Sequence, residues 1–418
     1  MQTGASAESP DLAQHPYRWL MLAGVWLLYF CFGLSMAALA PLVQPITHEL
    51  DISHVVMGGV FGSWPLVYIA SALPCGALLD RIGVRHGLFI GAVIIALSGI
   101  LRSFAGDAVG LFAAGALFGV GGPLISVGAP KAISLWFTGK SRGLAMGIYI
   151  TGPNLGSIVA LSLTNSVFMP ATDGDWRTVL LGYGLFTLVS AGVWLAISAH
   201  RAGRGIERQV DGAPPRSQLL VFADLIRLRA VRIVLLMSIG IFFFNHALNN
   251  WLPEILRVAG MDVVRAGLWA SIPTAVGIVA SLIIPRLAIP SRRLAILLGL
   301  FVCAAGATVL LQSTSEPGLM LGLIVQGVAR STMITLAILV LVEIPEVGPT
   351  KAGLASGLFF SAAEVGGVLG PLTMGFITDL SGGFDVGLQM LTGVCAVLAL
   401  LVVGLWRHER QHLRADER

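Results

Sequence analysis

The sequence predicts an all-α integral membrane protein with twelve transmembrane helices in two pseudo-symmetric six-helix bundles. Three observations support this fold class: the composition, the number of apolar runs and an internal repeat. Apolar residues make up 56% of the 418 residues, charged residues make up only 11%, and the mean hydropathy is +0.85. Soluble domains carry roughly a quarter charged residues, so this composition excludes a water-soluble fold.

Twelve apolar runs follow one another along the chain. Each is long enough for a helix that crosses about 30 Å of hydrocarbon with about 20 residues. They cover residues 19–43, 55–78, 87–105, 108–136, 142–169, 177–199, 231–253, 264–286, 293–313, 317–343, 351–378 and 386–406. The runs are Gly-rich and lack alternating polarity, which favours helices over a membrane barrel.

The polar gaps between the runs predict the domain organisation. The longest gap, 200–230, lies near the midpoint and is predicted to link a bundle at 19–199 to a second bundle at 231–406, with tails at 1–18 and 407–418. Most of the 26 Lys and Arg residues fall in alternate gaps, starting with the N-terminal tail. The positive-inside rule therefore predicts cytoplasmic termini, and we expect a multi-pass protein of a bacterial inner membrane. The alternation also accounts for the net charge of +4 without a nucleic-acid partner.

An internal repeat supports two related halves. Residues 143–157 align without a gap to residues 353–367, at an offset of 210. The identical pairs are Gly143/Gly353, Leu144/Leu354, Ala145/Ala355, Gly147/Gly357 and Gly156/Gly366. This offset places the fifth run over the eleventh, as a duplication of six helices requires.

The gap between the second and third runs carries a loop motif. It reads Gly76-Ala-Leu-Leu-Asp80-Arg81-Ile-Gly83-Val-Arg85. Gly76 would allow close helix approach and Gly83 a tight turn, and Asp80 can pair with a basic residue at a neighbouring helix end when the inner side is closed. This loop resembles the signature loop of the major facilitator superfamily. The corresponding gap at 285–293 lacks the Asp and both glycines, so we expect no gating role there.

A second motif opens the fifth run. It reads Trp136-Phe137-Thr-Gly139-Lys140-Ser141-Arg142-Gly143-Leu144-Ala145 and continues to Gly152-Pro153-Asn154. It resembles the same region of monocarboxylate and oxalate/formate-type carriers and of the cyanate and 2-nitroimidazole permeases. The segment Asn249-Asn250-Trp251-Leu252-Pro253 is similar to the latter branch. Gly139-Lys140-Ser141 is not a phosphate-binding loop, because Ser134 stands where that motif needs Gly.

The resemblance implies a secondary transporter that works by alternating access, with the first, fourth, seventh and tenth helices lining a central cavity. We predict transport of a small organic or inorganic anion, monocarboxylate- or cyanate-like, linked to protons. The alternative is export of neutral or cationic drug-like compounds of the nitroimidazole type, which predicts an apolar, aromatic cavity with Glu364 as its key group.

Charged groups inside the apolar runs are the main candidates for function, because each costs on the order of 2.5–3.5 kcal/mol at mid-bilayer. Arg330 lies in the tenth run and is predicted to bind a substrate anion through its guanidinium fork, or to pair with Glu364. Glu364 aligns with Asn154 in the repeat and is predicted to carry protons, or to form a permanent salt bridge. Lys131 either contacts substrate or extends to the interface.

Polar residues cluster in the seventh run. Asn245 and Asn249, and His246 and Asn250, are neighbours four residues apart, so they share one helix face and are predicted to bind substrate or water. His246 is a candidate proton site or a neutral hydrogen-bonding residue. Tyr29, Tyr149 and Asn154 complete the predicted substrate site.

We predict no catalytic residues, no metal and no cofactor, because no hydrolase or metal-ligand spacing occurs and the four cysteines lie apart in apolar runs. The expected partners are a small solute, protons and membrane lipid, and we expect a monomer.

Overall fold

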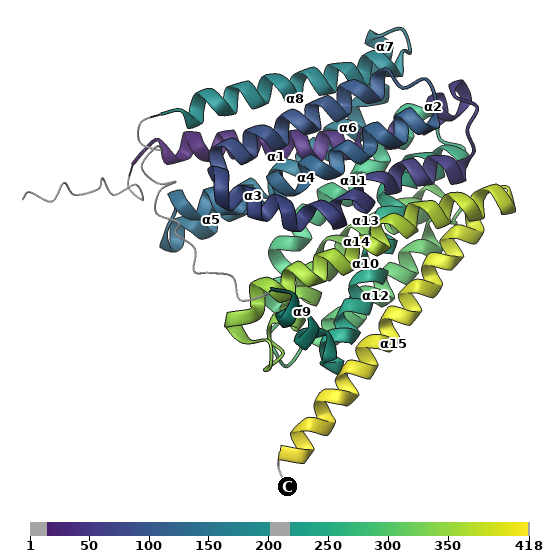
Figure 1. Ribbon diagram of the computed structural model, residues 1–418. Coiled ribbons are helices and arrows are strands. Elements are labelled where there is room, and N and C mark those ends of the chain that lie inside the picture. The colour runs from purple at the N-terminus through teal and green to yellow at the C-terminus, as the bar shows by residue number, and fades with distance from the viewer. Residues whose placement is uncertain (1–14, 201–217, 417–418) are drawn as a thin grey trace, which may run out of the picture.

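The computed structural model describes residues 15–200 and 218–416, and no strand occurs among them. Figure 1 shows two helical bundles, one from each half of the chain. The N-terminal half contains α1 (Arg18–Ala37), η1 (Ala40–Leu42), α2 (Val43–Glu49), α3 (His54–Ser103), α4 (Ala108–Trp136), α5 (Gly139–Tyr149), α6 (Thr151–Leu163), η2 (Thr164–Phe168), α7 (Met169–Ala171) and α8 (Trp176–Ser198). The C-terminal half contains α9 (Gln218–Arg227), α10 (Arg229–Val258), α11 (Val263–Leu287), α12 (Arg293–Leu310), α13 (Glu316–Val342), α14 (Gly348–Ser381) and α15 (Asp385–Asp416).

Twelve segments of the described chain are long and apolar enough to cross a membrane. Eleven helices meet this criterion, and one of them, α3, has 50 residues. At 1.5 Å per residue, such a helix would be about two and a half times as long as the hydrocarbon is thick. Its backbone leaves the helical region at Gly83, where φ is 78° and ψ is 163°, so α3 is two membrane segments joined at the predicted turn. The twelve-helix fold class is confirmed.

Both bundles use the same packing between their first and fifth helices. A Cβ on Gly156 of α6 would clash with the Phe30 carbonyl of α1, and a Cβ on Gly366 of α14 would clash with the Ile239 carbonyl of α10. The absent side chains let the backbones approach where lipid supplies no hydrophobic drive. Equivalent glycines therefore make equivalent contacts in the two halves, as the sequence repeat predicts.

The predicted domain limits differ in detail from the observed helices. Residues 201–217 of the predicted linker lie outside the described residues, but α9 occupies part of the remainder of that linker. The last helix, α15, continues through the predicted tail to Asp416.

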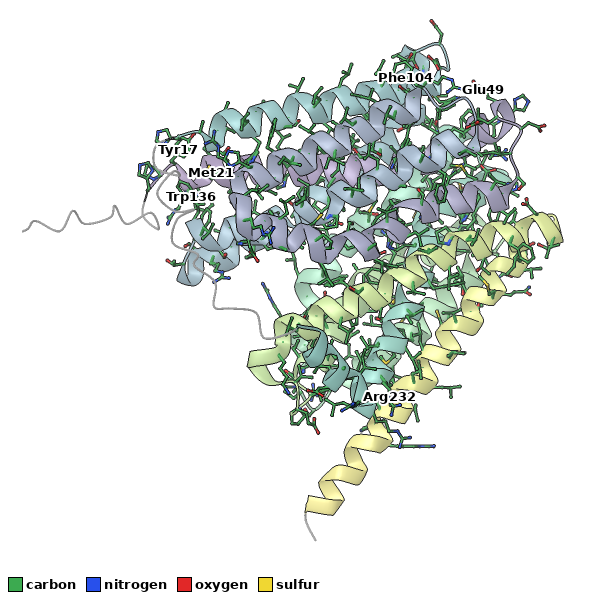
Figure 2. The ribbon with its side chains drawn as sticks, in the orientation of Figure 1. Tyr17, Met21, Glu49, Phe104, Trp136 and Arg232 are labelled. Atoms are coloured by element: carbon green, nitrogen blue, oxygen red, sulfur yellow. The ribbon has the colours of Figure 1, made fainter. Side chains whose placement is uncertain are left out.

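The two ends of the molecule can be named from Figure 2, which places Tyr17 and Trp136 at one end of the N-terminal bundle and Glu49 and Phe104 at the other. We call these ends the Tyr17 face and the Glu49 face. Five helices that begin at the Glu49 face, α3, α4, α8, α11 and α13, have capped N-termini. The side chains of Ser53, Asp107, Asp175, Asp262 and Ser315 accept backbone N–H bonds there. The Thr178 hydroxyl and the amides of Arg177 and Thr178 lower the pKa of Asp175.

The bundles pack together at the Glu49 face and diverge toward the Tyr17 face (Figure 1). A Cβ on Gly58 of α3 would lie 2.5 Å from the Pro371 carbonyl oxygen of α14, and a Cβ on Gly267 of α11 would lie 2.5 Å from the Leu161 carbonyl oxygen of α6. Toward the Tyr17 face, a Cβ on Gly76 of α3 or on Gly353 of α14 would meet nothing within 4 Å. The structure is therefore closed at the Glu49 face.

A single carboxylate fastens the two bundles at the closed face. Asp379 of α14 accepts hydrogen bonds from the backbone amides of His54 at 3.1 Å and Val55 at 2.8 Å, and its Oδ1 lies 2.9 Å from His54 Nδ1. The acid thus caps the N-terminus of α3 from the other half of the protein, where the helix dipole favours a negative charge.

We expect Asp379→Asn to weaken closure of the Glu49 face by about 1 kcal/mol, because an amide lacks the charge and one of the two acceptor oxygens. Distances between spin labels at Phe104 and Val386, in protein with Cys303 replaced by Ser, would report the change. Asp51→Asn is the matched control, since it removes one exposed charge near the same helix start. Identical distance distributions for the two variants would contradict the proposed fastening role.

Candidate functional site

A polar cavity of about 320 Å³ lies between the bundles. Its walls come from α1, α3 and α6 of one half and from α10, α11 and α13 of the other. The lining residues are Met36, Trp64, Ile150, Asn154, Asn245, His246, Asn249, Asn250, Pro273, Thr274, Gly277, Ser281, Arg330, Ser331, Ile334 and Thr335. The lining contains one guanidinium and no carboxylate, and most of it comes from the C-terminal half.

Arg330 provides the formal positive charge of the cavity. Its Nη1 donates to Asn249 Oδ1 of α10 at 3.0 Å, and its Nη2 donates to Thr274 Oγ1 of α11 at 3.0 Å. Both acceptors are neutral. The predicted alternative, a structural pair between Arg330 and Glu364, does not occur among the described ion pairs.

The α10 asparagines play different parts around this cavity. Asn249 accepts from Arg330, whereas Asn245 donates to the Ile241 carbonyl at 2.8 Å and Asn250 donates to the His246 carbonyl at 2.8 Å. Asn154 reaches the cavity from α6 and donates weakly to the Ile150 carbonyl at 3.4 Å. The structure therefore brings all four predicted asparagines to one cavity.

Glu364 and His246 lie together beside the cavity. A Cβ on Gly367 would lie 2.6 Å from Glu364 Oε2 and 3.1 Å from His246 Nδ1, so both side chains converge on this glycine. Glu364 is buried, and its Oε2 has no hydrogen-bond partner among the described residues. The His246 ring stacks on Phe242 at 5.4 Å and, across the bundle interface, on Trp64 of α3 at 5.3 Å.

Three residues predicted for the substrate site lie outside the cavity lining. Lys131 Nζ forms an ion pair with Asp80 Oδ1 at 2.6 Å, so it joins α4 to the predicted gating loop. Tyr29 and Tyr149 stack on each other at 5.5 Å and do not line the cavity.

The predicted gating residues lie around the bend of α3 at Gly83, on the Tyr17 face. Asp80 pairs with Lys131 within the N-terminal bundle, and Gly83 supplies the positive φ of the turn. The Arg85 carbonyl accepts from Trp194 Nε1 at 3.0 Å. Arg81 is exposed, and Gly76 makes no close helix contact in this closed-face arrangement. Their role in gating stays a prediction.

Thr274 and the other lining hydroxyls are not among the residues that the sequence predicts for the site. Serine and threonine in membrane helices usually bond a carbonyl of their own helix, as Ser331 does to Gly327 at 2.7 Å, so the residue type alone does not identify a site. Thr274 differs because its described partner is Arg330, 56 positions away. Only the tertiary contact distinguishes it.

A second cavity of about 280 Å³ lies near the Glu49 face, lined in part by Asn165, Asp173, Glu254 and Arg257. Its guanidinium is neutralised, because Arg257 donates from Nε at 2.8 Å and from Nη2 at 2.7 Å to the two oxygens of Glu254. Among the described residues, this lining therefore holds no uncompensated cation of the kind that Arg330 supplies in the central cavity.

Twelve segments long and apolar enough to cross a membrane, in two related bundles around a polar cavity, are the architecture of a multi-pass membrane protein. The family match that follows makes this protein a transporter and not an enzyme. The chain belongs to the Major Facilitator Superfamily, whose family model matches residues 25–315 and 289–418. The resemblance inferred from the loop after the second membrane segment is thereby confirmed.

Curated relatives cover nearly the whole chain. The uncharacterized transporter YycB of Bacillus subtilis is 25% identical over 92% of this chain and 92% of its own length. The probable L-galactonate transporter of Escherichia coli is 25% identical over 89% of this chain and 85% of its own. The hexuronate transporter of Bacillus subtilis is 25% identical over 92% of each.

A solved structure confirms the fold. The crystal structure of the nucleoside transporter NupG matches with a TM-score of 0.77 and 13% identity, covering 94% of this chain and 99% of that one. The more specific resemblance to cyanate and monocarboxylate carriers stays a prediction, since the curated relatives above that are named by a solute are named by galactonate and hexuronate.

We expect Gly367→Ala to lower the transport rate by roughly tenfold, because the new Cβ would displace Glu364 or His246 by overpacking. Initial rates of solute uptake into proteoliposomes measure the effect. Gly357→Ala is the matched control on the same helix, since a Cβ there would meet nothing within 4 Å. Equal rates for the two variants would show that the space around Gly367 has no role.

Proposed function

We propose that this transporter moves a small organic anion, a carboxylate of the sugar-acid type, by alternating access and in company with a proton. The observation that carries the proposal is the Arg330 guanidinium, which lines the cavity and is bonded to two neutral side chains. A cation without a countercharge in a low-dielectric site attracts an anion, and a guanidinium suits a carboxylate in particular.

The remaining lining supports a hydroxylated solute. Four asparagines and the hydroxyl residues Thr274, Ser281, Ser331 and Thr335 line the same cavity as the guanidinium. Amides and hydroxyls both donate and accept, so they can match the alternating hydroxyl groups of a sugar acid. The relatives described as galactonate and hexuronate transporters support the same class. Cyanate and simple monocarboxylates would use the guanidinium but few of these groups.

The lining argues against the drug-export alternative. That hypothesis predicts an apolar, aromatic cavity with Glu364 at its centre. Trp64 is the large aromatic ring of the lining, and Glu364 is absent from it. A cationic compound would also face Arg330 without a nearby carboxylate in the described wall.

Glu364 is the proposed proton carrier. Glu364 is 5% exposed, its carboxyl lies beside Gly367 as the cavity residue His246 does, and it has no basic partner among the described ion pairs. Burial without a countercharge favours the protonated, neutral form of a carboxyl. A neutral carboxyl suits a step in which the site changes its access from one side of the membrane to the other. One anion and one proton together carry no net charge.

We infer that the Tyr17 face is cytoplasmic, in a bacterial inner membrane, because basic residues concentrate at that end of the helices. Among described residues these include Arg81, Arg85, Arg142, Arg232, Arg286, Arg292 and Lys351. The positive-inside rule favours this orientation. The closed Glu49 face would then make this an inward-facing state. The cavity is complete within one chain, which supports a monomer as the transport unit.

We expect Arg330→Gln to raise the KM for galactonate or glucuronate by roughly 10- to 100-fold, since it removes a charge-assisted pair worth about 1.5–3 kcal/mol. Uptake into proteoliposomes, tested on a panel of small anions, cations and neutral aromatics, provides the measurement. Arg330→Lys keeps the charge and should be intermediate. Unchanged anion affinity in Arg330→Gln would end the anion assignment.

For Glu364→Gln we expect loss of accumulation driven by an imposed pH gradient, with counterflow exchange retained, because the amide keeps the shape but cannot release a proton. Both assays are run on the same proteoliposomes. Loss of both activities would instead indicate a defect in binding or folding, and retention of both would remove Glu364 from the coupling step.

A further inference from the structure

Arg330 is held from two helices at once by neutral acceptors. Asn249 of α10 binds Nη1 and Thr274 of α11 binds Nη2, each at 3.0 Å. A free arginine side chain has about 2 kcal/mol of rotamer entropy to lose, so these two bonds fix its plane before a solute arrives. Of the five N–H donors of the guanidinium, three remain for the solute.

Two glycines explain why Thr274 reaches the guanidinium. A Cβ on Gly327 of α13 would lie 2.5 Å from the Pro273 carbonyl oxygen of α11, and a Cβ on Gly277 of α11 would lie 2.9 Å from Ser331 Oγ of α13. The helices therefore approach closely on both sides of the contact. Thr274 sits between Pro273 and Gly277, as Arg330 does between Gly327 and Ser331.

The Thr274 hydroxyl has a different kind of hydrogen-bond partner from the neighbouring hydroxyls. Ser281 donates to the Ile278 carbonyl and Thr332 to the Val328 carbonyl, both within their own helices. Thr274 is 6% exposed, and its described bond runs to Arg330 on another helix. A buried hydroxyl that accepts from a charged donor orients that donor without cancelling its charge.

We propose that Thr274 is a specificity-determining positioning residue, which fixes the Arg330 guanidinium in the orientation that accepts a planar carboxylate. This inference rests on the proposed anion transport. It adds that carboxylates are preferred over spherical anions because the guanidinium plane is fixed by Thr274, with Asn249 as the second acceptor.

Thr274→Val and Thr274→Ser form the test pair, since valine keeps the shape and removes the acceptor while serine restores it. In proteoliposomes, Thr274→Val should raise the KM for galactonate by about tenfold with kcat within about twofold, and Thr274→Ser should stay within about twofold of wild type in both. Inhibition by acetate should weaken in Thr274→Val, whereas inhibition by chloride should not change.

A double-mutant cycle with Arg330→Lys separates positioning from packing. An ammonium is a point charge without a plane to fix, so Thr274→Val should have less than about a twofold further effect on KM in the Arg330→Lys protein. A packing role would give the same factor in both proteins, and that result would overturn the proposal. So would a serine variant as impaired as the valine variant.

Two further controls keep the outcome decisive. If Thr274→Val lowers the thermal unfolding temperature, Thr274→Ala replaces it in the test. Inhibition by acetate should then weaken in Thr274→Ala while inhibition by chloride stays unchanged. If both anions inhibit Thr274→Ala as they inhibit wild type, the proposal is rejected. If wild-type protein transports none of the carboxylates, the proposed function itself fails and this inference with it. If wild type transports them and Thr274→Val matches it, only the positioning role fails.

Discussion

The arrangement of the cavity depends on the hydrogen bonds that neutral side chains make to the Arg330 guanidinium inside an apolar helix bundle. A buried charge needs either a countercharge or several well-placed dipoles. The protein uses dipoles, since Asn249 and Thr274 accept from the guanidinium and neither is charged. The bonds also tie α13 to α10 and α11, so charge solvation and helix packing are satisfied by the same contacts.

Pseudo-symmetric packing coexists with asymmetric chemistry. Gly156 and Gly366 make equivalent helix contacts in the two halves, yet the aligned positions Asn154 and Glu364 carry an amide and a carboxyl. The guanidinium, the buried carboxyl and His246 all belong to the C-terminal half. The N-terminal half contributes the Trp64 ring, which stacks on His246 across the interface. One histidine therefore lines the cavity, lies with the buried acid around Gly367, and stacks on the opposite bundle.

Closure at one face gives the cavity its shape. Small residues allow α3 to meet α14 and α6 to meet α11 near the Glu49 face, and Asp379 caps α3 from the opposite bundle. Apolar packing accompanies these contacts, since the Phe61 ring of α3 lies 5.3 Å from the Trp251 ring of α10 across the two bundles. Within the C-terminal bundle, α11 and α13 also approach closely around Gly327 and Gly277, beside Arg330.

Hydropathy, the repeat and the loop at Gly76 to Arg85 were enough to determine twelve helices in two related halves, because a bilayer permits few ways to satisfy the backbone. The sequence also singled out Arg330, His246, Glu364 and the asparagines as candidates, since polar groups are costly in an apolar segment, and all of them except Glu364 line the cavity. Tertiary structure alone decided their partners. Lys131 pairs with Asp80, Tyr29 stacks on Tyr149, and Thr274 binds Arg330. Periodicity fixes the face of a helix, whereas a partner depends on how closely two helices approach and at what height, and glycines far apart in the chain set that distance.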